Sequence, residues 1–568
     1  MRMTITAGTV ATSLDAGGAT AVRAPVVALK IVLVLLVLAL TVSAPLTSFY
    51  VRAQDLPVAA LCAGLLIFFL RDRLPRVGRP TVAALGDRRM VWTVAVMVAV
   101  LSWLAGRLLL LDVALSRDEQ MVLFDASVFL RGEWAAATPE AWQPLAGAMN
   151  DMFLVPLGGV ARVSAYLPGN AMLHAVSTAA LGSHAWWNPV MAGVGILATA
   201  SVAHRATGGD RLVVGAAIIL VATSMQVIAT SGTVYAMPSH LAFNMLWLAL
   251  VLRGGALCHG LAVMVAAIAC GLHQVVFHPF FAGPFVLWLL IAGRWRWGLF
   301  HAGAYALIGL FWLAWPGLQS EAVLGADALA QAAAPPGLIE RALALLDTAS
   351  LSALPLMSAN LLRYVAWQNL AFLPLFVAGC LLLWRRREPF GLALGLCLLA
   401  TPLLMAILLP YQGHGWGYRY LHGLIGIGAL VGGLGLRSMA DACPDRARSL
   451  VVAGTALTVL VAWPWQGWHL HRTATPHATA HQALAASSAD VVLVNPLGAP
   501  FSVDLVINDA ALSAPVRLIE PLVNAEELDR LCREGMVARL APQHYSQIAA
   551  IYGVEARISA DLTPDPCS

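Results

Sequence analysis

Charge is scarce in this sequence: only 11% of its 568 residues are Asp, Glu, Lys or Arg, against about 25% in soluble domains. Lysine is almost missing, with Lys30 the one example, and a net charge of +4 gives no support for nucleic-acid binding. The eight cysteines form no Cys-x-x-Cys pair, so they provide no metal or redox motif. Apolar residues make up 60% of the chain and fall into long runs between short polar links. This pattern predicts an all-α polytopic membrane protein.

The apolar runs predict about thirteen transmembrane helices within a domain that spans residues 26–467. We expect these helices at residues 26–48, 56–70, 91–112, 186–204, 211–229, 240–252, 256–273, 277–292, 298–315, 363–384, 390–409, 421–436 and 449–467. Five arginine clusters then share one side of the membrane, at residues 71–89, 205–211, 294–296, 385–387 and 437–448. Arginine-rich loops stay in the cytoplasm, so this side is predicted to be cytoplasmic.

The same alternation of spans places the other segments. The N-terminus is predicted to be cytoplasmic, with residues 1–25 disordered because they are small and polar. The opposite, extracytoplasmic side receives loop 113–185, loop 316–362, the link 411–420 and the tail from residue 468. The segment 166–181 is predicted to be an interfacial or re-entrant helix, because a full span here would move every later arginine cluster outside.

The first large loop begins with Ser116-Arg117-Asp118-Glu119, which is a capping-box pattern. It predicts a helix that starts at about Arg117 and stops at Gly132. Asp118 and Asp125 would share one stripe of this helix, beside an apolar strip that can lie on the membrane surface. Ionisable groups at a membrane are costly and tend to be functional. For Glu119 the capping role competes with a catalytic one, and Asp125 could instead face solvent.

These residues resemble a known family. The Asp118-Glu119 pair and the helix end Gly132-Glu133-Trp134 are similar to the first loop of GT-C superfamily glycosyltransferases, which include protein mannosyltransferases and lipid A aminoarabinose transferases. Further along, Tyr166-Leu167-Pro168-Gly169-Asn170 and the stretch from Asn188-Pro189 to Gly208 resemble the next elements of those proteins. Gly415-Trp416-Gly417-Tyr418-Arg419-Tyr420-Leu421 is similar to a Trp-Gly-Pro-Arg-Tyr element, with Tyr418 in place of the usual proline. The resemblance covers about residues 91–436.

The resemblance implies inverting transfer of a sugar from a polyprenyl-phosphate donor to a hydroxyl of a lipid, glycan or protein acceptor. It also implies a multi-pass protein of a bacterial inner membrane, and its catalytic aspartate maps to Asp118, with Glu119 beside it. Such a reaction needs a base for the acceptor hydroxyl and a cation for the departing phosphate. Arg419 is the first candidate for the phosphate, and Arg363 and Arg117 are the alternatives.

Further polar and aromatic residues are expected on the same side of the membrane. His240 and His414 could bind phosphate, sugar hydroxyls or a metal, and a divalent metal is possible although no ligand spacing supports one. Trp416 could stack on a sugar. The remaining substrate-binding candidates are Tyr420, Asp125 and Tyr166.

The tail from residue 468 changes character and predicts a small extracytoplasmic α/β domain. Residues 489–495, 502–508 and 516–519 read as strands and residues 525–534 as a helix. Cys532 and Cys567 both lie here, and an extracytoplasmic location would allow a disulfide between them, but the sequence leaves open whether it forms.

Two other functions remain open. A transporter or flippase would also have many helices, but the sequence shows no inverted repeat and its spans are nearly free of charge. A polymerase or ligase of lipid-linked glycans would be expected to carry a late loop rich in Arg and His. Here loop 316–362 is mostly Ala, Leu and Pro.

Overall fold

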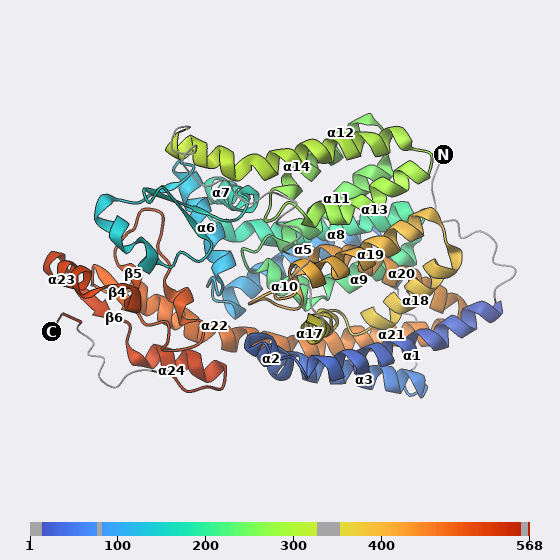
Figure 1. The fold of residues 1–568 in the computed structure, drawn as a ribbon. Coiled ribbons are helices and arrows are strands. Elements are labelled where there is room, and N and C mark those ends of the chain that lie inside the picture. Colours follow the sequence, from blue (N-terminus) through green and yellow to red (C-terminus); the bar gives the residue numbers. More distant parts are fainter. Residues whose placement is uncertain (1–13, 76–81, 326–352, 558–565, 568) are drawn as a thin grey trace.

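The structure is a computed structural model that describes residues 14–75, 82–325, 353–557 and 566–567. Long helices run side by side in an elongated bundle, and smaller elements gather at one end of it (Figure 1). Loop 316–362 lies largely outside the described residues. Only its first part, which is helical, and its last part, which begins another helix, can be compared with the sequence.

The first part of the bundle is formed, in the described ranges, by the helices α1 (Leu14–Ala39), α2 (Pro45–Tyr50), α3 (Leu56–Leu70), α4 (Val82–Leu85), α5 (Arg88–Leu104), α8 (Trp187–Ala206), α9 (Arg211–Ala222), α10 (Met225–Ser231), α11 (Met237–Arg253), α12 (Ala256–Cys270), α13 (Phe277–Ile291), α14 (Trp295–Leu324), α17 (Ala353–Ala366), α18 (Phe372–Arg386) and α19 (Pro389–Leu408). The last part of the bundle is formed by a 3-10 turn (Arg419–Leu424), α20 (Ile425–Ala442), α21 (Pro444–Leu457) and α22 (Trp463–Ala485). Three π-helical turns, Val51–Asp55, Ala105–Leu109 and Thr458–Ala462, extend α2 into α3, prolong α5 and join α21 to α22.

Among the described residues, six helical segments are long and apolar enough to cross a membrane. A seventh is obtained if α9 and α10, which meet at a 53° bend, count as one span. A multi-pass helical protein is therefore found, while the predicted number of thirteen spans is not confirmed. Several predicted spans are too short or are broken: α12 and α13 have 15 residues each, and residues 363–384 are divided between α17 and α18.

Three boundaries differ from the prediction for local reasons. Helix α1 begins at Leu14, so the predicted disorder of residues 1–25 is wrong from Leu14 on, because the Ala-rich start extends the apolar helix; residues 1–13 lie outside the described residues. The predicted helix 26–48 ends early, and Pro45 starts α2 at a position where proline is favoured. Helix α22 continues to Ala485, well past the predicted end of the bundle at residue 467.

Close helix packing in the bundle depends on glycine. A β-carbon on Gly435 of α20 would lie 1.9 Å from the carbonyl oxygen of Leu375 in α18, and one on Gly379 of α18 would lie 2.0 Å from the carbonyl oxygen of Val431. Both positions therefore require glycine, and they let the two backbones touch, as small residues do in membrane bundles.

The first large loop folds into α6 (Arg117–Leu130), the antiparallel strands β1 (Ala136–Ala137), β2 (Leu154–Leu157) and β3 (Ala161–Ser164), and α7 (Gly169–Leu181). With 13 residues α7 is too short to span a membrane, as predicted for segment 166–181. Helix α6 starts at the predicted residue, and Ser116 accepts a hydrogen bond from the backbone N–H of Glu119. The stripe of α6 that carries Asp118, Val122 and Asp125 does not face solvent, because all three residues are buried.

The C-terminal domain is a parallel sheet with helices on both faces. Its strands are β4 (Val491–Val494), β5 (Val516–Ile519) and β6 (Val537–Arg539), in the order β5-β4-β6, and its helices are α23 (Ala525–Glu534) and α24 (Pro542–Ile551). Strand β4 is buried on both faces: Val492 and Val494 pack with α22 and α24, while Val491 and Leu493 pack with α23. The predicted strand 502–508 is wrong, since Ser502–Leu505 form a 3-10 turn.

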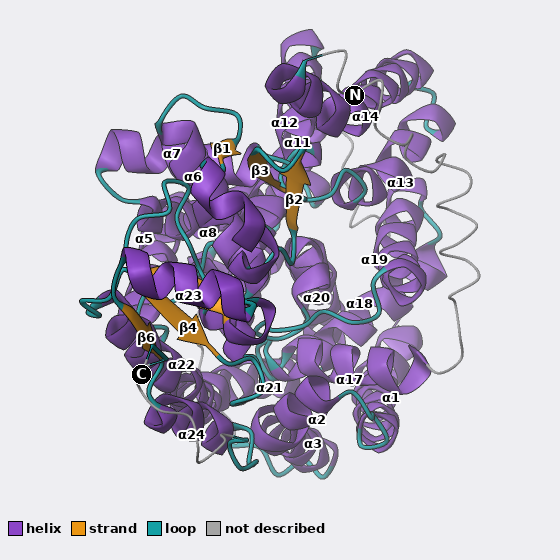
Figure 2. Ribbon diagram, turned by 60° about the vertical axis from the view of Figure 1, so that its left-hand side comes forward, coloured by secondary structure: helices purple, strands orange, loops and turns teal. Residues whose placement is uncertain are grey.

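Cys532 and Cys567 form a disulfide, a pairing that the sequence left open. The domain lies at the same end of the bundle as α6, α7 and strands β1–β3, and Figure 2 shows these parts side by side. Residues Leu145 and Met149 of the first loop belong to the same apolar cluster as β4 and α23. The first loop and the C-terminal domain therefore share one core.

The orientation of the bundle can be checked with two exposed positions at its opposite ends, Ser488 after α22 and Arg386 at the end of α18. In cells whose outer barrier has been permeabilised, a membrane-impermeant maleimide should label the Ser488→Cys variant and leave Arg386→Cys unlabelled until the membrane is opened. Labelling of Arg386→Cys alone would show that the orientation predicted from the arginine clusters is reversed.

The carboxyl group of Asp125 provides a test of how α6 is fastened to β3. It accepts a hydrogen bond of 3.3 Å from the backbone N–H of Ser164, and burial raises its pKa to about 7 from an ordinary 3.8. The folded state then holds a proton that the unfolded state has lost, so stability decreases as the pH rises from about 4 to 7. Between pH 5 and pH 8 the free energy of unfolding should therefore decrease less in Asp125→Asn than in the wild type. We expect the two decreases to differ by about 1 kcal/mol or more, since one pKa unit corresponds to ~1.4 kcal/mol. The measurement is the thermal unfolding midpoint in detergent across this range.

The exposed carboxylate Asp529 on α23 supplies the control, since Asp529→Asn should leave the profile of the wild type unchanged. If Asp125→Asn showed the same pH profile as the wild type, the Asp125 carboxyl group would not titrate between the two states.

Candidate functional site

Asp118 and Arg419, which are far apart in the sequence, form a buried ion pair at the end of the bundle that carries the first loop. Their side chains are only 11% and 6% exposed. Asp118 lies in the first turn of α6, where the helix dipole favours a carboxylate. Arg419 begins the 3-10 turn that leads into α20. The structure thus brings together the predicted base and the predicted phosphate ligand.

Two tyrosines from other elements complete the surroundings of this pair. The hydroxyl of Tyr166, which lies between β3 and α7, donates a hydrogen bond to Asp118. The ring of Tyr235 lies 5.0 Å from the Arg419 guanidinium, and its hydroxyl shares a hydrogen bond of 2.6 Å with Ser116, the cap of α6. Burial alone would raise the pKa of Asp118, but the Arg419 charge and the hydrogen bond from Tyr166 hold it below its ordinary value. The carboxylate is therefore ionised at neutral pH.

Residues of link 411–420, to which Arg419 itself belongs, also hold Arg419 in place. Its backbone N–H donates to the side-chain oxygen of Gln412 (2.9 Å), and its guanidinium donates to the Gln412 carbonyl. The ring of Tyr420 lies 5.2 Å from the guanidinium. These contacts fix the cation beside Asp118 without a second carboxylate, so the Arg419 charge is balanced by Asp118 alone among the ion pairs of the described residues.

A small cavity adjoins the pair. It is lined by Arg419, Tyr420 and His240 together with Asn244, Phe277 and Thr401. Both ring nitrogens of His240 are buried without a hydrogen-bond partner among the described residues, and the same holds for His273, whose ring stacks on Tyr166 at 4.2 Å. Burial lowers the pKa of His273 to about 4, so this ring is neutral at pH 7. Neutral imidazoles without partners beside a cation are suited to hydrogen-bond a polar ligand.

Three predicted residues of the first loop have structural contacts instead. Glu119 turns back to the start of α6 and accepts the backbone N–H of Leu115 at 3.1 Å, which is the capping role. Asp125 lies two turns further along α6 and holds β3, so neither a solvated nor a substrate-binding position is found for it. Arg117 donates to the carbonyls of Asn150, Met152 and Val506, and so ties α6 to the C-terminal domain rather than to a phosphate.

Arg363 also has another partner. It lies in α17, not at the start of a helix, and it pairs with Asp55 at 3.3 Å, both side chains being fully buried. Its guanidinium donates to the carbonyl of Gly415 at 2.6 Å. Arg363 therefore holds the backbone of link 411–420, which carries Arg419.

The two other residues predicted in this link are buried among aromatic rings. Trp416 is 3% exposed and packs against Tyr50 and Trp367, so it is not placed to stack on a sugar. The Nδ1 atom of His414 shares a hydrogen bond of 2.8 Å with the Tyr50 hydroxyl, and its ring lies against Phe501 of the C-terminal domain. Both residues hold the link in place.

Sequence reasoning missed Tyr235, Gln412 and Asp55. Tyr235 and Gln412 lie in short polar links at the ends of predicted spans, and Asp55 immediately precedes one. A carboxylate at a span boundary was a usable signal for Asp55, because such a group requires a cationic partner. Within the described ranges no three His, Cys, Asp or Glu side chains come together in a way that could hold a metal ion.

Comparisons with known proteins give one kind of match. No family model matches the chain, and no curated protein matches it. Among solved structures, the chain is similar to ArnT from Cupriavidus metallidurans in the apo state, with 13% sequence identity and a TM-score of 0.48. The similarity covers 82% of this chain and 95% of that one. At such identity and TM-score the likeness assigns no residue a role, and the function has to be inferred from the side chains of the site.

Proposed function

We propose that this protein transfers a sugar from a polyprenyl-phosphate donor to a hydroxyl group of a lipid, glycan or protein acceptor, with inversion, at the extracytoplasmic membrane face. The observation that carries the proposal is the buried pair of Asp118 and Arg419, a base and a cation in contact at one end of a membrane-type bundle. The resemblance of the sequence to polyprenyl-phosphate-sugar transferases around both residues supports the same function.

The reaction needs few groups because the lipid phosphate is already a good leaving group. The Asp118 carboxylate accepts the proton of the acceptor hydroxyl, while the oxygen of that hydroxyl forms a bond to the anomeric carbon of the donor sugar. The bond from that carbon to the phosphate oxygen breaks on the opposite face of the sugar, and the phosphate leaves with the electron pair. Arg419 balances the charge of the departing phosphate through parallel N–H···O hydrogen bonds.

The ion pair also suggests how donor binding activates the base. In the structure Arg419 balances Asp118, and burial would otherwise raise the pKa of this carboxyl. A donor phosphate that binds Arg419 draws the guanidinium away from Asp118, so the carboxylate becomes a stronger base once the donor is in place. The unpartnered His240 and the hydroxyl of Tyr420 lie beside Arg419 and can receive the phosphate or the sugar.

The central test uses purified protein in detergent with a panel of labelled polyprenyl-phosphate sugars, following release of polyprenyl phosphate. Asp118→Asn should reduce turnover by about 100-fold or more, which is the usual contribution of a general base. Arg419→Lys should also reduce turnover, since lysine keeps the charge but loses the planar fork. The matched control is Asp125→Asn, a buried carboxyl group on the same helix that should keep near wild-type turnover.

The other outcomes separate the alternatives. If a folded Asp118→Asn variant had normal turnover, Asp118 would not be the base and would only stabilise the start of α6. If neither the wild type nor the variants consumed any donor, a transporter or flippase would become the better description. Consumption only of donors that carry a long lipid-linked glycan would favour a polymerase or ligase.

A second prediction concerns the pH dependence. In the free enzyme the pKa of Asp118 is below its ordinary value of 3.8, so kcat/KM for the donor should stay flat on the acid side down to about pH 5. With donor bound, Arg419 is shared with the phosphate and the pKa of Asp118 rises, so kcat should fall at a higher pH than kcat/KM does. Profiles of both parameters from pH 4.5 to 8 check this, and acid limbs that coincide would show that the donor does not separate the pair.

A further inference from the structure

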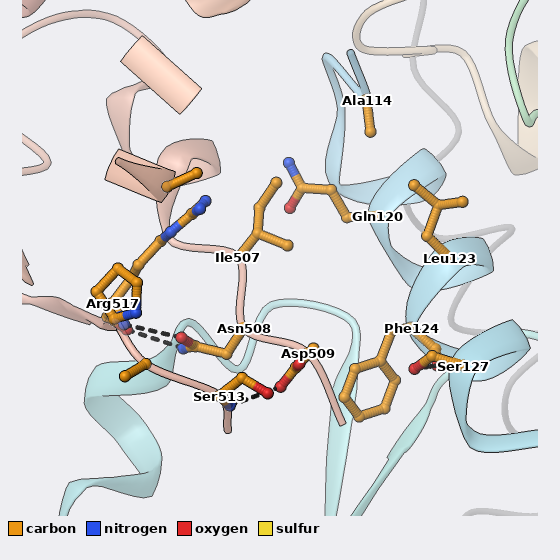
Figure 3. A pocket seen from close by; sticks show the side chains of 13 residues that line it. Ala114, Gln120, Leu123, Phe124, Ser127, Ile507, Asn508, Asp509, Ser513 and Arg517 are labelled. Atoms are coloured by element: carbon orange, nitrogen blue, oxygen red, sulfur yellow. Dashed lines mark hydrogen bonds between the residues drawn. The ribbon is translucent and has the colours of Figure 1, made fainter. Parts of the chain in front are cut away.

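A cavity of about 380 Å³ opens between α6 and the C-terminal domain, apart from the site described above (Figure 3). One wall is formed by Gln120, Leu123, Phe124 and Ser127 of α6, and the facing wall includes Arg517 at the start of β5 and Asp509. At 3.6 residues per turn, the four α6 residues lie on the opposite side of the helix from Asp118. The cavity and the Asp118 carboxylate are thus back to back on one helix, and the volume lies within the range of small-molecule sites.

The walls of the cavity are held rigid by hydrogen bonds. The Gln120 side chain receives a hydrogen bond from Arg117 at 2.9 Å and donates to the carbonyl of Asp504 at 2.8 Å. The side-chain amide of Asn508 donates a hydrogen bond to the backbone carbonyl of Arg517 and accepts one from the backbone N–H of Arg517, each at 2.8 Å. A site whose lining is fixed before the ligand arrives loses less entropy on binding.

Arg517 supplies the chemical character of the cavity. The side chain is half-buried, and its Nη1 atom contacts His481 Nδ1 (3.3 Å) and the carbonyl of Leu505 (3.4 Å). In the part of the chain that the structure describes, no carboxylate forms an ion pair with it, and burial lowers its pKa without an opposing charge. A partly desolvated cation that lines a cavity and forms no ion pair favours an anionic ligand.

The rest of the lining favours a ring with hydroxyl groups. Asp509 is exposed at the rim, and its carboxylate accepts the backbone N–H of Ser513 at 2.9 Å, which leaves lone pairs to accept from ligand hydroxyls. The hydroxyl of Ser127 and the ring of Phe124 lie on the opposite wall. Figure 3 shows Asn508, Asp509 and Arg517 facing Gln120, Leu123 and Phe124 across the open space.

We propose that this cavity binds a sugar unit that carries an anionic group, a phosphate or a carboxylate, with the anion on Arg517 and the hydroxyls on Asp509. Assignment of this sugar to the acceptor rests on the proposed function. A glycan long enough to pass around α6 would bind here with one unit and present its hydroxyl to Asp118 with another. Binding energy from such a remote unit can be used to orient the reacting one.

The test measures binding of four probes to the purified full chain in detergent by calorimetry: glucose 6-phosphate, glucuronic acid, glucose and inorganic phosphate. We expect one or both anionic sugars to bind at least about tenfold more tightly than glucose and inorganic phosphate. The better of the two identifies the anion as phosphate or carboxylate. Arg517→Gln should weaken this binding about tenfold, and Ser127→Trp, which fills the cavity from the α6 wall, should abolish it.

The contrary outcomes are separate for the two proposals. Equal binding of inorganic phosphate and the sugars would make this a bare anion site, and no binding, or binding unchanged in both variants, would overturn the proposal. Asp118→Asn should bind the probes as the wild type does. Slow hydrolysis of the donor in the absence of an acceptor should be unchanged in Arg517→Gln and Ser127→Trp. If no donor is consumed at all, the proposed function fails while the binding result stands.

Discussion

The cost of burying charge governs this end of the molecule. Removing one partner of a buried ion pair typically costs about 3–5 kcal/mol, because the other charge is left without a counter-ion. Asp118 and Arg419 therefore have to meet, and the elements that carry them, the start of α6 and the link before α20, have to meet with them. The N-cap at Ser116, the ring of Tyr235 and the hydroxyl of Tyr166 all contact this one pair or its immediate neighbours. A pair that costs this much to bury, and that adjoins two histidines without partners, is better explained by a ligand than by stability.

The link that carries Arg419 would be flexible on its own, and this explains the second buried pair. Gly413, Gly415 and Gly417 all have positive φ angles, conformations that only glycine adopts readily. The backbone of this link is fastened at Gly415 by Arg363, at Tyr418 by Gln226 and at Pro410 by Asn360. Asp55 balances Arg363 so that this donor can be buried. The Asp55–Arg363 pair thus supports Arg419, so Arg363, the alternative candidate from the sequence, has different contacts from Arg419.

The sequence allowed a good prediction of local features and a poor one of contacts between distant segments. The start of α6, the helix α23 and the strands β4 and β5 follow from capping and alternation, which are local, and the structure has them. The pairing of Asp118 with Arg419 was expected only as a shared location, because a resemblance in two separate motifs places both near the donor. The burial of Trp416 and the contacts of Arg363 and Arg117 depend on which helix packs beside which, and no periodicity encodes that. The break of α9 from α10 was missed for the same reason, since Thr223 and Ser224 are ordinary residues within an apolar run.

The C-terminal domain is part of the wall around α6, and this changes how the helix should be understood. Arg117 and Gln120 bond to the backbone of Val506 and Asp504, and Asn150 donates to the carbonyl of Val503. The segment around these residues therefore holds the turn of α6 that carries Asp118, while Phe501 at its start packs on His414 in the link that carries Arg419. One short stretch of the domain thus contacts both halves of the ion pair's support. A domain that only covered this end of the bundle would have no reason to reach both elements, whereas one that sets the distance between Asp118 and Arg419 must do so.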